Sequence, residues 1–299
     1  MTSWWKGGVI YQIYPRSFFD TSGNGIGDLK GITNKLNYVS DLGADAIWLS
    51  PFFTSPMKDM GYDVSNYTDI DPLFGDLSDF DELIKTAHRL NLKVIIDQVL
   101  SHSSDQMPFF QNSKISKTSE KTNWYVWADP KKDGSPPNNW LSMFGGSAWE
   151  WEPMRDQYYL HNFLISQPDF NLHNAEVQNW LLDTSRFWLE KDVDGFRLDT
   201  VNYYFHDKEL KDNPPSLIEY KRPPTNLYYM QNQIHAINQP ENLVFVERIR
   251  ALVDEYEDRT TVGEIGDIHR PIEIMADYTK GDKRLHMAYS FELLSSKFS

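Results

Sequence analysis

The feature that most constrains the fold is a repeated order of short apolar segment, loop and amphipathic helix. The apolar segments Val9–Tyr14, Ala46–Ser50 and Val94–Val99 are rich in β-branched and aromatic residues and do not alternate with polar ones. Strands of this kind are buried on both faces, as happens when helices cover a parallel sheet. The sequence therefore predicts an α/β fold with parallel strands.

Helical segments separate the predicted strands. Their apolar residues recur three or four positions apart, as in Leu29, Ile32, Leu36 and Val39. The second helix is predicted to start at Ser78, with Asp81 completing a capping box. Further helices are predicted over 175–190 and 243–256, and further strands over 194–199, 260–264 and 287–292.

The alternation breaks between the third strand and the third helix. Residues 103–170 are rich in Pro, Gly, Asn and Trp and lack a helical period. A stretch this long is better explained as an inserted subdomain than as a loop. We therefore divide the chain into a first barrel part (1–102), an inserted subdomain (103–170) and a second barrel part (171–299).

Two architectures compete for such a strand pattern. A (β/α)8 TIM barrel needs eight strands, and six are recognisable, so this reading expects a barrel truncated at its C-terminus. A doubly wound sheet is complete with six strands, but it predicts a Gly-rich phosphate-binding turn after the first strand. The loop found there, residues 20–28, contains Asp20 and Asp28 and suits a cation better than a phosphate. The barrel is therefore favoured.

Composition excludes several classes of partner and cofactor. The formal net charge is −14, which argues against nucleic acid and anionic membranes as partners. The chain contains no cysteine, so disulfides and thiolate chemistry are excluded, and no motif for an organic cofactor is present. Neither a signal peptide nor an apolar run long enough to span a membrane is recognisable, so a cytoplasmic enzyme is expected.

Polar residues gather where the predicted strands end, which is where barrel enzymes place their active sites. They are Asp97 and His102 after the third strand, Arg197 and Asp199 at the fourth, and Glu264 at the fifth. Two carboxylates on neighbouring strands suit retaining glycoside hydrolysis, in which one attacks the anomeric carbon and the other protonates the leaving oxygen. Structural ion pairs at the barrel mouth are the alternative for each residue taken alone.

Several motifs resemble one known family. Gly195–Thr200 (GFRLDT) and Thr261–Glu264 (TVGE) are similar to the fourth- and fifth-strand signatures of the α-amylase superfamily, glycoside hydrolase family 13. Gln167–Asn171 (QPDFN) resembles the QPDLN segment of its α-glucosidase and oligo-1,6-glucosidase branch, with Phe170 in place of Leu. Residues 4–28 and 49–64 are also similar to that branch.

The resemblance implies a role for each matching residue. Asp199 would be the nucleophile and Glu264 the general acid/base, with Asp97 supporting the site. Thr200, the residue after the nucleophile, would favour α-1,4 over α-1,6 bonds. The substrate would be a short α-glucoside of the maltose or sucrose type, and its glucosyl unit would be bound by Asp59, Tyr62, His102, Phe163, Arg197 and Thr200. Core packing is the alternative role for Phe163.

The resemblance also implies features outside the catalytic pair. A structural Ca²⁺ or Mg²⁺ would bind the first loop through oxygen ligands at alternate positions, namely Asp20, Ser22, Asn24, Ile26 (by its carbonyl) and Asp28. A metal-free turn is the alternative reading. No position matches the family's third acidic residue or its C-terminal β-domain, so we expect these 299 residues alone to hold an incomplete site.

Three functions remain open at this point. The first is an α-glucosidase, with glucosyl transfer possible when a sugar intercepts the intermediate. The second is a sucrose isomerase or a phosphorolytic relative. The third is a non-catalytic member resembling transporter-associated heavy chains, which is disfavoured because both Asp199 and Glu264 are present. A monomer or a homodimer is expected.

Overall fold

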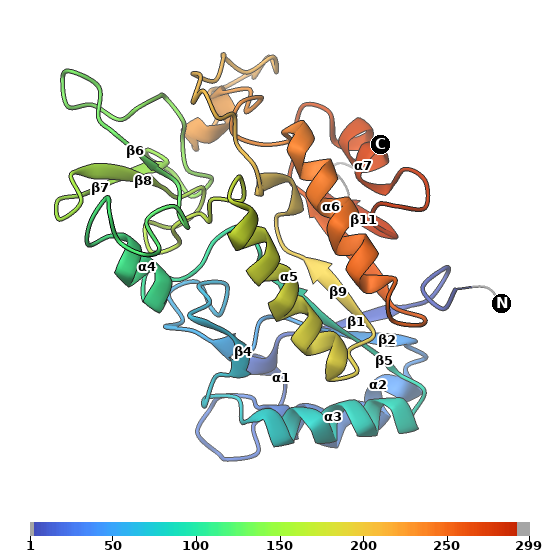
Figure 1. Ribbon diagram of the computed structural model, residues 1–299. Coiled ribbons are helices and arrows are strands. Elements are labelled where there is room, and N and C mark those ends of the chain that lie inside the picture. The colour runs from blue at the N-terminus through green and yellow to red at the C-terminus, as the bar shows by residue number, and fades with distance from the viewer. Residues whose placement is uncertain (1–2, 292–299) are drawn as a thin grey trace.

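The computed structural model describes residues 3–291 and has a curled parallel sheet at its centre (Figure 1). Within these residues the sheet has six strands in the order β1-β2-β5-β9-β10-β11, which is also their order along the chain. All neighbouring pairs are parallel. The strands are β1 (Ile10–Ile13), β2 (Ala46–Leu49), β5 (Lys93–Gln98), β9 (Gly195–Leu198), β10 (Thr260–Ile265) and β11 (Met287–Ser290).

This strand order decides between the two architectures. A doubly wound sheet reverses its strand order at a switch point, and here each strand lies beside the next one in the sheet. Because parallel crossovers are right-handed, sequential order places the connecting helices on one side of the sheet, as in a barrel. The predicted six strands and the TIM-barrel fold class are confirmed. Glu292, predicted as the end of the sixth strand, lies outside the described residues.

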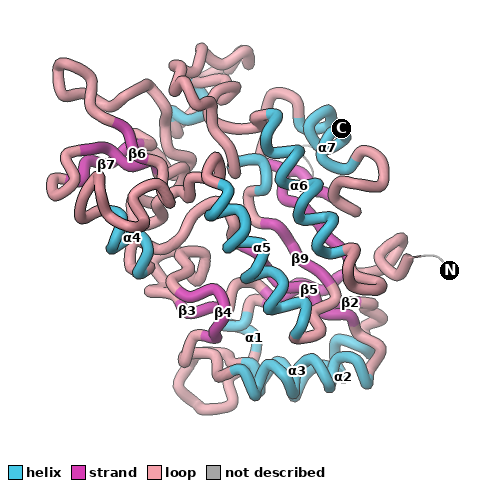
Figure 2. The backbone as a smooth tube through the Cα atoms, viewed as in Figure 1, coloured by secondary structure: helices cyan, strands magenta, loops and turns pink. Residues whose placement is uncertain are grey.

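The connecting helices are held by the apolar faces that the sequence predicted. Leu29, Ile32, Leu36 and Val39 of α2 are all fully buried. Figure 2 shows α2 and α3 beside each other below the sheet and α5 and α6 along its outer face. The helices are α1 (Pro15–Phe18), α2 (Leu29–Asp41), α3 (Leu77–Arg89), α5 (Ala175–Glu190), α6 (Pro240–Val253) and α7 (Pro271–Thr279).

The start of α3 differs from the prediction. Asp76, not Ser78, is the N-cap, and its side chain accepts hydrogen bonds from the backbone N–H groups of Ser78 and Asp79. Asp79, not Asp81, completes the capping box. The reason is that an aspartate two residues earlier offers a carboxylate acceptor, and Ser78 itself donates its hydroxyl to Asp76.

Residues 103–170 form structure of their own beside the barrel strands. They contain a short helix, α4 (Pro108–Ser113), and an antiparallel sheet in the order β6-β8-β7. The strands of this sheet are β6 (Trp127–Ala128), β7 (Trp149–Glu152) and β8 (Gln157–Leu160). A two-stranded sheet of β3 (Phe53–Thr54) and β4 (Asn66–Ile70) precedes this region in the chain, and the sequence reading did not predict it.

A long excursion after β9 also approaches the inserted region. It contains the 3-10 helices η1 (Val201–Tyr203) and η2 (Leu227–Met230). The Asn226 side chain donates a hydrogen bond to the Met143 carbonyl oxygen, 2.7 Å away. The excursion and the inserted region therefore meet above the end of the central sheet. Across residues 3–291, no helix combines the length and the apolar character needed to cross a membrane.

Candidate active site

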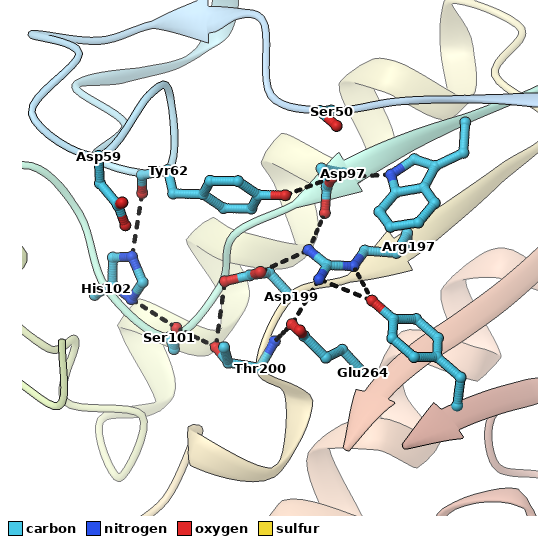
Figure 3. Close-up of polar contacts among 12 residues, drawn as sticks. Ser50, Asp59, Tyr62, Asp97, Ser101, His102, Arg197, Asp199, Thr200 and Glu264 are labelled. Carbon is cyan, nitrogen blue, oxygen red and sulfur yellow. Dashed lines mark hydrogen bonds and ion pairs between the residues drawn. The ribbon is translucent and has the colours of Figure 1, made fainter. Parts of the chain in front are cut away.

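The register of the parallel strands brings the predicted polar residues together. Asp97 of β5 pairs with Arg197 of β9, and Gly263 of β10 pairs with Leu198 of β9. Asp199 and Glu264 therefore follow at neighbouring ends of β9 and β10. Arg197 and Asp199 lie two positions apart, so their side chains leave the strand on the same face. Figure 3 shows the four side chains converging.

Arg197 is the centre of this cluster. Its Nη1 atom contacts Asp97 and lies 2.6 Å from Asp199 Oδ1, while Nη2 lies 2.6 Å from Glu264 Oε2. The Arg197 side chain is only 4% exposed, so these ion pairs are shielded from solvent. The Tyr289 hydroxyl lies 3.0 Å from Nε and 2.9 Å from Nη2 and accepts their hydrogen bonds. One guanidinium thus orients three carboxylates.

Asp97 is fully buried behind the pair formed by Asp199 and Glu264. Its Oδ2 atom accepts a hydrogen bond from Trp48 Nε1 at 2.9 Å and a longer one from the Tyr62 hydroxyl at 3.4 Å. Burial raises the pKa of Asp97 to about 6, against the opposing effect of Arg197. Asp97 therefore contacts Arg197, Trp48 and Tyr62 from behind the pair.

Glu264 has the properties of a general acid. Burial, followed by the neighbouring negative charge of Asp199, raises its pKa to about 8, and Arg197 opposes this shift without overcoming it. Oε2 already faces two donors, Arg197 Nη2 and the Thr200 backbone N–H at 3.0 Å. Because Oε2 already accepts from these two donors, the acidic proton belongs on Oε1.

A second group of polar residues lies across the cavity from Arg197. The Gln167 amide donates a hydrogen bond to Asp59 Oδ2 at 2.8 Å, and Gln167 Nε2 lies 3.1 Å from His102 Nε2. Burial lowers the pKa of His102 and raises that of Asp59. His102 is therefore neutral near pH 7 and can exchange hydrogen bonds in either direction through its ring nitrogens.

The two polar groups face a cavity of about 340 Å³, at the small end of ligand pockets in proteins. Its walls combine the polar residues with rings and apolar side chains. Phe163 packs against His102, Phe144 and Tyr203, with ring centroids 5.1 to 5.6 Å apart. All eight residues predicted to be catalytic or substrate-binding line this cavity: Asp59, Tyr62, His102, Phe163, Arg197, Asp199, Thr200 and Glu264.

Sequence reasoning missed four residues that support this site. Trp48 and Tyr289 were read as strand residues, and their polar atoms contact Asp97 and Arg197. Gln167 was noted for its motif, but its contacts with Asp59 and His102 were not foreseen. Ser101 was not considered, and its hydroxyl lies 2.9 Å from His102 Nδ1. Ser101 directly precedes a predicted site histidine, which was the available signal.

The predicted metal loop folds around Asp20. The carboxylate of Asp20 accepts backbone hydrogen bonds from Ser22, Gly23 and Gly25, and these bonds, the one from Gly25 foremost, lower its pKa. Asn24 Oδ1 accepts from the Ile26 N–H at 2.8 Å. Within residues 3–291, no group of three or more His, Cys, Asp or Glu side chains is arranged to hold a metal.

The loop nevertheless suits a hard cation. Burial and, more weakly, repulsion from the charge of Asp20 act to raise the pKa of Asp28, but hydrogen bonds from Thr21 and Gly31 keep that pKa below its usual value. A divalent ion would relieve this repulsion. Asp20, Ser22, Asn24, Asp28 and the Ile26 carbonyl supply the oxygen chemistry that Ca²⁺ and Mg²⁺ prefer.

Known proteins with similar sequences extend this picture. The probable α-glucosidase of Rhizobium meliloti (strain 1021) is 61% identical over 296 residues, which are 98% of this chain and 54% of that protein. The oligo-1,6-glucosidase of Heyndrickxia coagulans is 43% identical over 293 residues, 98% of this chain and 51% of that protein. The chain therefore spans about half the length of these relatives.

Solved structures agree with the sequence comparison. The α-glucosyl transfer enzyme XgtA superposes with a TM-score of 0.96 at 56% identity, covering 100% of this chain and 56% of that one. The trehalulose synthase MutB from Pseudomonas mesoacidophila has a TM-score of 0.86 at 38% identity, covering 98% of this chain and 50% of that one. The α-amylase catalytic-domain model matches residues 12–299. Together with the carboxylate cluster at the strand ends, these matches show that the chain belongs to the α-amylase family, glycoside hydrolase family 13.

Proposed function

We propose that this chain carries the catalytic pair of a retaining α-glucosidase that acts on short α-glucosides. The observation that supports this most directly is the different surroundings of two adjacent carboxyl groups. Glu264 has a pKa raised to about 8, whereas Asp199 lies 2.6 Å from the Arg197 guanidinium. One carboxyl group that keeps its proton beside one that stays ionised is the requirement for this reaction.

In the proposed reaction, Asp199 attacks the anomeric carbon while Glu264 donates its proton to the leaving oxygen. This gives a glucosyl ester on Asp199 and releases the rest of the substrate as an alcohol. Glu264, now ionised, then takes a proton from water, and the resulting hydroxide attacks the anomeric carbon and releases Asp199. Asp59, His102 and Tyr62 line the cavity. In the proposed complex Asp59 and His102 would bind hydroxyl groups of the glucosyl unit, and Tyr62 would stack on its ring.

Trapping of the intermediate tests this proposal. The protein at its full encoded length would be incubated with 5-fluoro-α-glucosyl fluoride, digested and analysed by mass spectrometry. We expect the fluoroglucosyl label on Asp199, and none on the matched variant Asp199→Ala. An unlabelled protein that also fails to hydrolyse 4-nitrophenyl α-glucoside would contradict the proposal and favour a non-catalytic member of the family.

We further propose a preference for α-1,4 or sucrose-type bonds over α-1,6 bonds. Thr200 supports it, because it lines the cavity directly after Asp199 and the resemblance links this position to the type of bond cleaved. The ratio of kcat/KM for maltose and isomaltose tests the proposal. A preference for isomaltose would refute it.

Glucosyl transfer is the second candidate activity. It is favoured by the apolar residues at the cavity, among them Met143, Phe144 and Phe291, which suit an organic acceptor better than water. XgtA and the trehalulose synthase MutB are similar proteins whose names state transfer and synthase activities. Product analysis with sucrose as substrate distinguishes the two activities, because hydrolysis gives glucose and fructose whereas isomerisation gives a new disaccharide.

We propose that the loop of residues 20–28 binds Ca²⁺ or Mg²⁺ through the five oxygen donors described above. Such an ion would be structural, because the loop lies apart from the residues that line the cavity. The domain boundaries, the cytoplasmic location and the monomeric or homodimeric state remain predictions from the sequence.

A further inference from the structure

A chain of side-chain hydroxyl groups joins His102 to Asp199. The Ser101 hydroxyl lies 2.9 Å from His102 Nδ1 and 3.0 Å from Thr200 Oγ1. The Thr200 hydroxyl in turn donates to Asp199 Oδ2 at 3.3 Å. Figure 3 shows Ser101 between His102 and Thr200. Ser101 is 2% exposed, so water does not replace these contacts freely.

The acceptor at the end of this chain fixes its direction. An ionised carboxylate can only accept hydrogen bonds, so Thr200 donates to Asp199. Thr200 Oγ1 then accepts from the Ser101 hydroxyl, and the Ser101 oxygen accepts from His102 Nδ1. Every donor in this series of hydrogen bonds therefore points towards Asp199. In a buried site, each hydrogen bond of such a series strengthens its neighbours. This order requires neutral His102 to carry its proton on Nδ1.

Contacts on the other side of the imidazole ring also affect which nitrogen of His102 carries the proton. Gln167 Oε1 accepts from the Leu164 N–H at 2.9 Å, which directs the Gln167 amino group towards Asp59 and towards His102 Nε2. An unprotonated Nε2 can accept from that amino group. The Tyr62 carbonyl oxygen, 3.1 Å from Nε2, favours the opposite tautomer. The two sides of the ring thus favour opposite tautomers.

The backbone conformation of Thr200 allows its N–H and its hydroxyl to make these hydrogen bonds. Its φ of 42° and ψ of 44° lie in the left-handed region, which is costly for a β-branched residue. In this conformation its N–H donates to Glu264 while its hydroxyl lies between Ser101 and Asp199. One residue therefore contacts both members of the catalytic pair, and Ser101 is the group that restrains its hydroxyl.

We propose that Ser101 is a positioning residue whose hydroxyl links His102 through Thr200 to Asp199, holding His102 as the Nδ1–H tautomer and Asp199 in its attacking orientation. The effect on kinetics rests on the proposed glucosidase function. The hydrogen bonding of Ser101 and the tautomer of His102 do not depend on that function. Ser101 acts through Thr200 and His102, which line the cavity, and it requires no contact with substrate.

Kinetics of the full encoded protein with 4-nitrophenyl α-glucoside test the coupling. We expect Ser101→Ala to lower kcat about tenfold, as for loss of one buried hydrogen bond in the transition state, with KM changed less than about threefold. Thr200→Val should also lower kcat, because it removes the hydroxyl that lies between Ser101 and Asp199. Because the chain acts as a unit, the double variant Ser101→Ala/Thr200→Val should be no slower than Thr200→Val alone.

Ser103→Ala is the matched control, since Ser103 is equally buried but bonds to Tyr125 instead. Unchanged kcat in Ser101→Ala, or multiplicative losses in the double variant, would overturn the proposal. An independent measurement is ¹⁵N NMR of histidine-labelled protein, with His102 assigned from a His102→Gln variant. We expect Nδ1 to be protonated in the parent protein and the proton to move to Nε2 in Ser101→Ala.

If His102 of the parent protein is protonated on Nε2, the proposed role of Ser101 is wrong, even if the enzyme is active. Conversely, if the protein hydrolyses no α-glucoside, the proposed function fails, but the NMR result still decides whether the hydroxyl chain exists. The failure of one proposal is therefore distinguishable from the failure of the other.

Discussion

Replacing Glu264 by Gln should make the protein inactive and more stable, and the gain should depend on pH. The pKa of Glu264 is raised from 4.5 to about 8 in the folded protein. Below pH 4.5 the Glu264 side chain is protonated in both the folded and the unfolded protein, so its burial costs little folding free energy. As pH rises from 4.5 towards 8, the unfolded chain releases this proton and the folded protein retains it, so stability is lost.

The size of the effect follows from the proton linkage. Each pH unit in this window removes about 1.4 kcal/mol of folding free energy, so the loss at pH 7 is about 3 kcal/mol. Glutamine resembles the protonated side chain and can still accept from Arg197 and from the Thr200 N–H. It should therefore recover about 3 kcal/mol at pH 7 and very little at pH 4.5.

Thermal unfolding of the full encoded protein provides the assay. For a protein of this size, we expect Glu264→Gln to raise Tm by roughly 5 °C at pH 7, with a much smaller gain at pH 4.5. The exposed Glu257→Gln is the matched control and should leave Tm unchanged at both pH values. An equal shift at both pH values, or a Tm lowered at pH 7, would refute the reasoning.

Three further predictions use other parts of the molecule. The value of kcat/KM should fall about tenfold per pH unit above pH 8, where Glu264 loses its proton, and a flat profile to pH 10 would exclude it as the acid. Asp194→Asn should destabilise the protein by about 3–5 kcal/mol in urea unfolding, because the buried Asp194 pairs with Lys93 at 3.0 Å and Arg259 at 3.1 Å. The control is Asp258→Asn, which removes an exposed ion pair 3.6 Å from Lys93 and should cost less than about 1 kcal/mol. Removing divalent ions with EDTA should lower Tm, and Ca²⁺ should restore it in the parent protein but not in Asp20→Ala; a Tm indifferent to EDTA would count against the ion.

The fold was predictable where the sequence has a strong period. The α5 helix has the predicted bounds of 175–190, and the predicted apolar face of α2 is buried. The N-cap of α3 was misplaced by two residues because several adjacent polar residues can cap a helix, and only their geometry selects Asp76. The α7 helix was not predicted, since its nine residues are too few for a clear period.

The candidate site was predictable to the extent that its residues are charged. Asp97, Arg197, Asp199 and Glu264 stand out at strand ends because a charge at a buried position needs an explanation. Trp48 and Tyr289 do not stand out, because each is also an ordinary strand residue, and only the register directs its single polar atom into the cluster. Contacts between residues that are far apart in sequence are decided by packing, which periodicity does not encode.

The balance of charge at Arg197 explains why two acidic residues of one cluster take different roles. Three carboxyl groups, Asp97, Asp199 and Glu264, contact one guanidinium, so ionising all three would leave two uncompensated negative charges in a buried site. Asp97 and Glu264 have raised pKa values of about 6 and about 8. At pH 7 the retained proton therefore lies on Glu264, which is nearest to the cavity mouth of these two by its 11% exposure against 0% for Asp97. The cluster thus holds its proton on the carboxyl group nearer the cavity, as the acid role proposed for Glu264 requires.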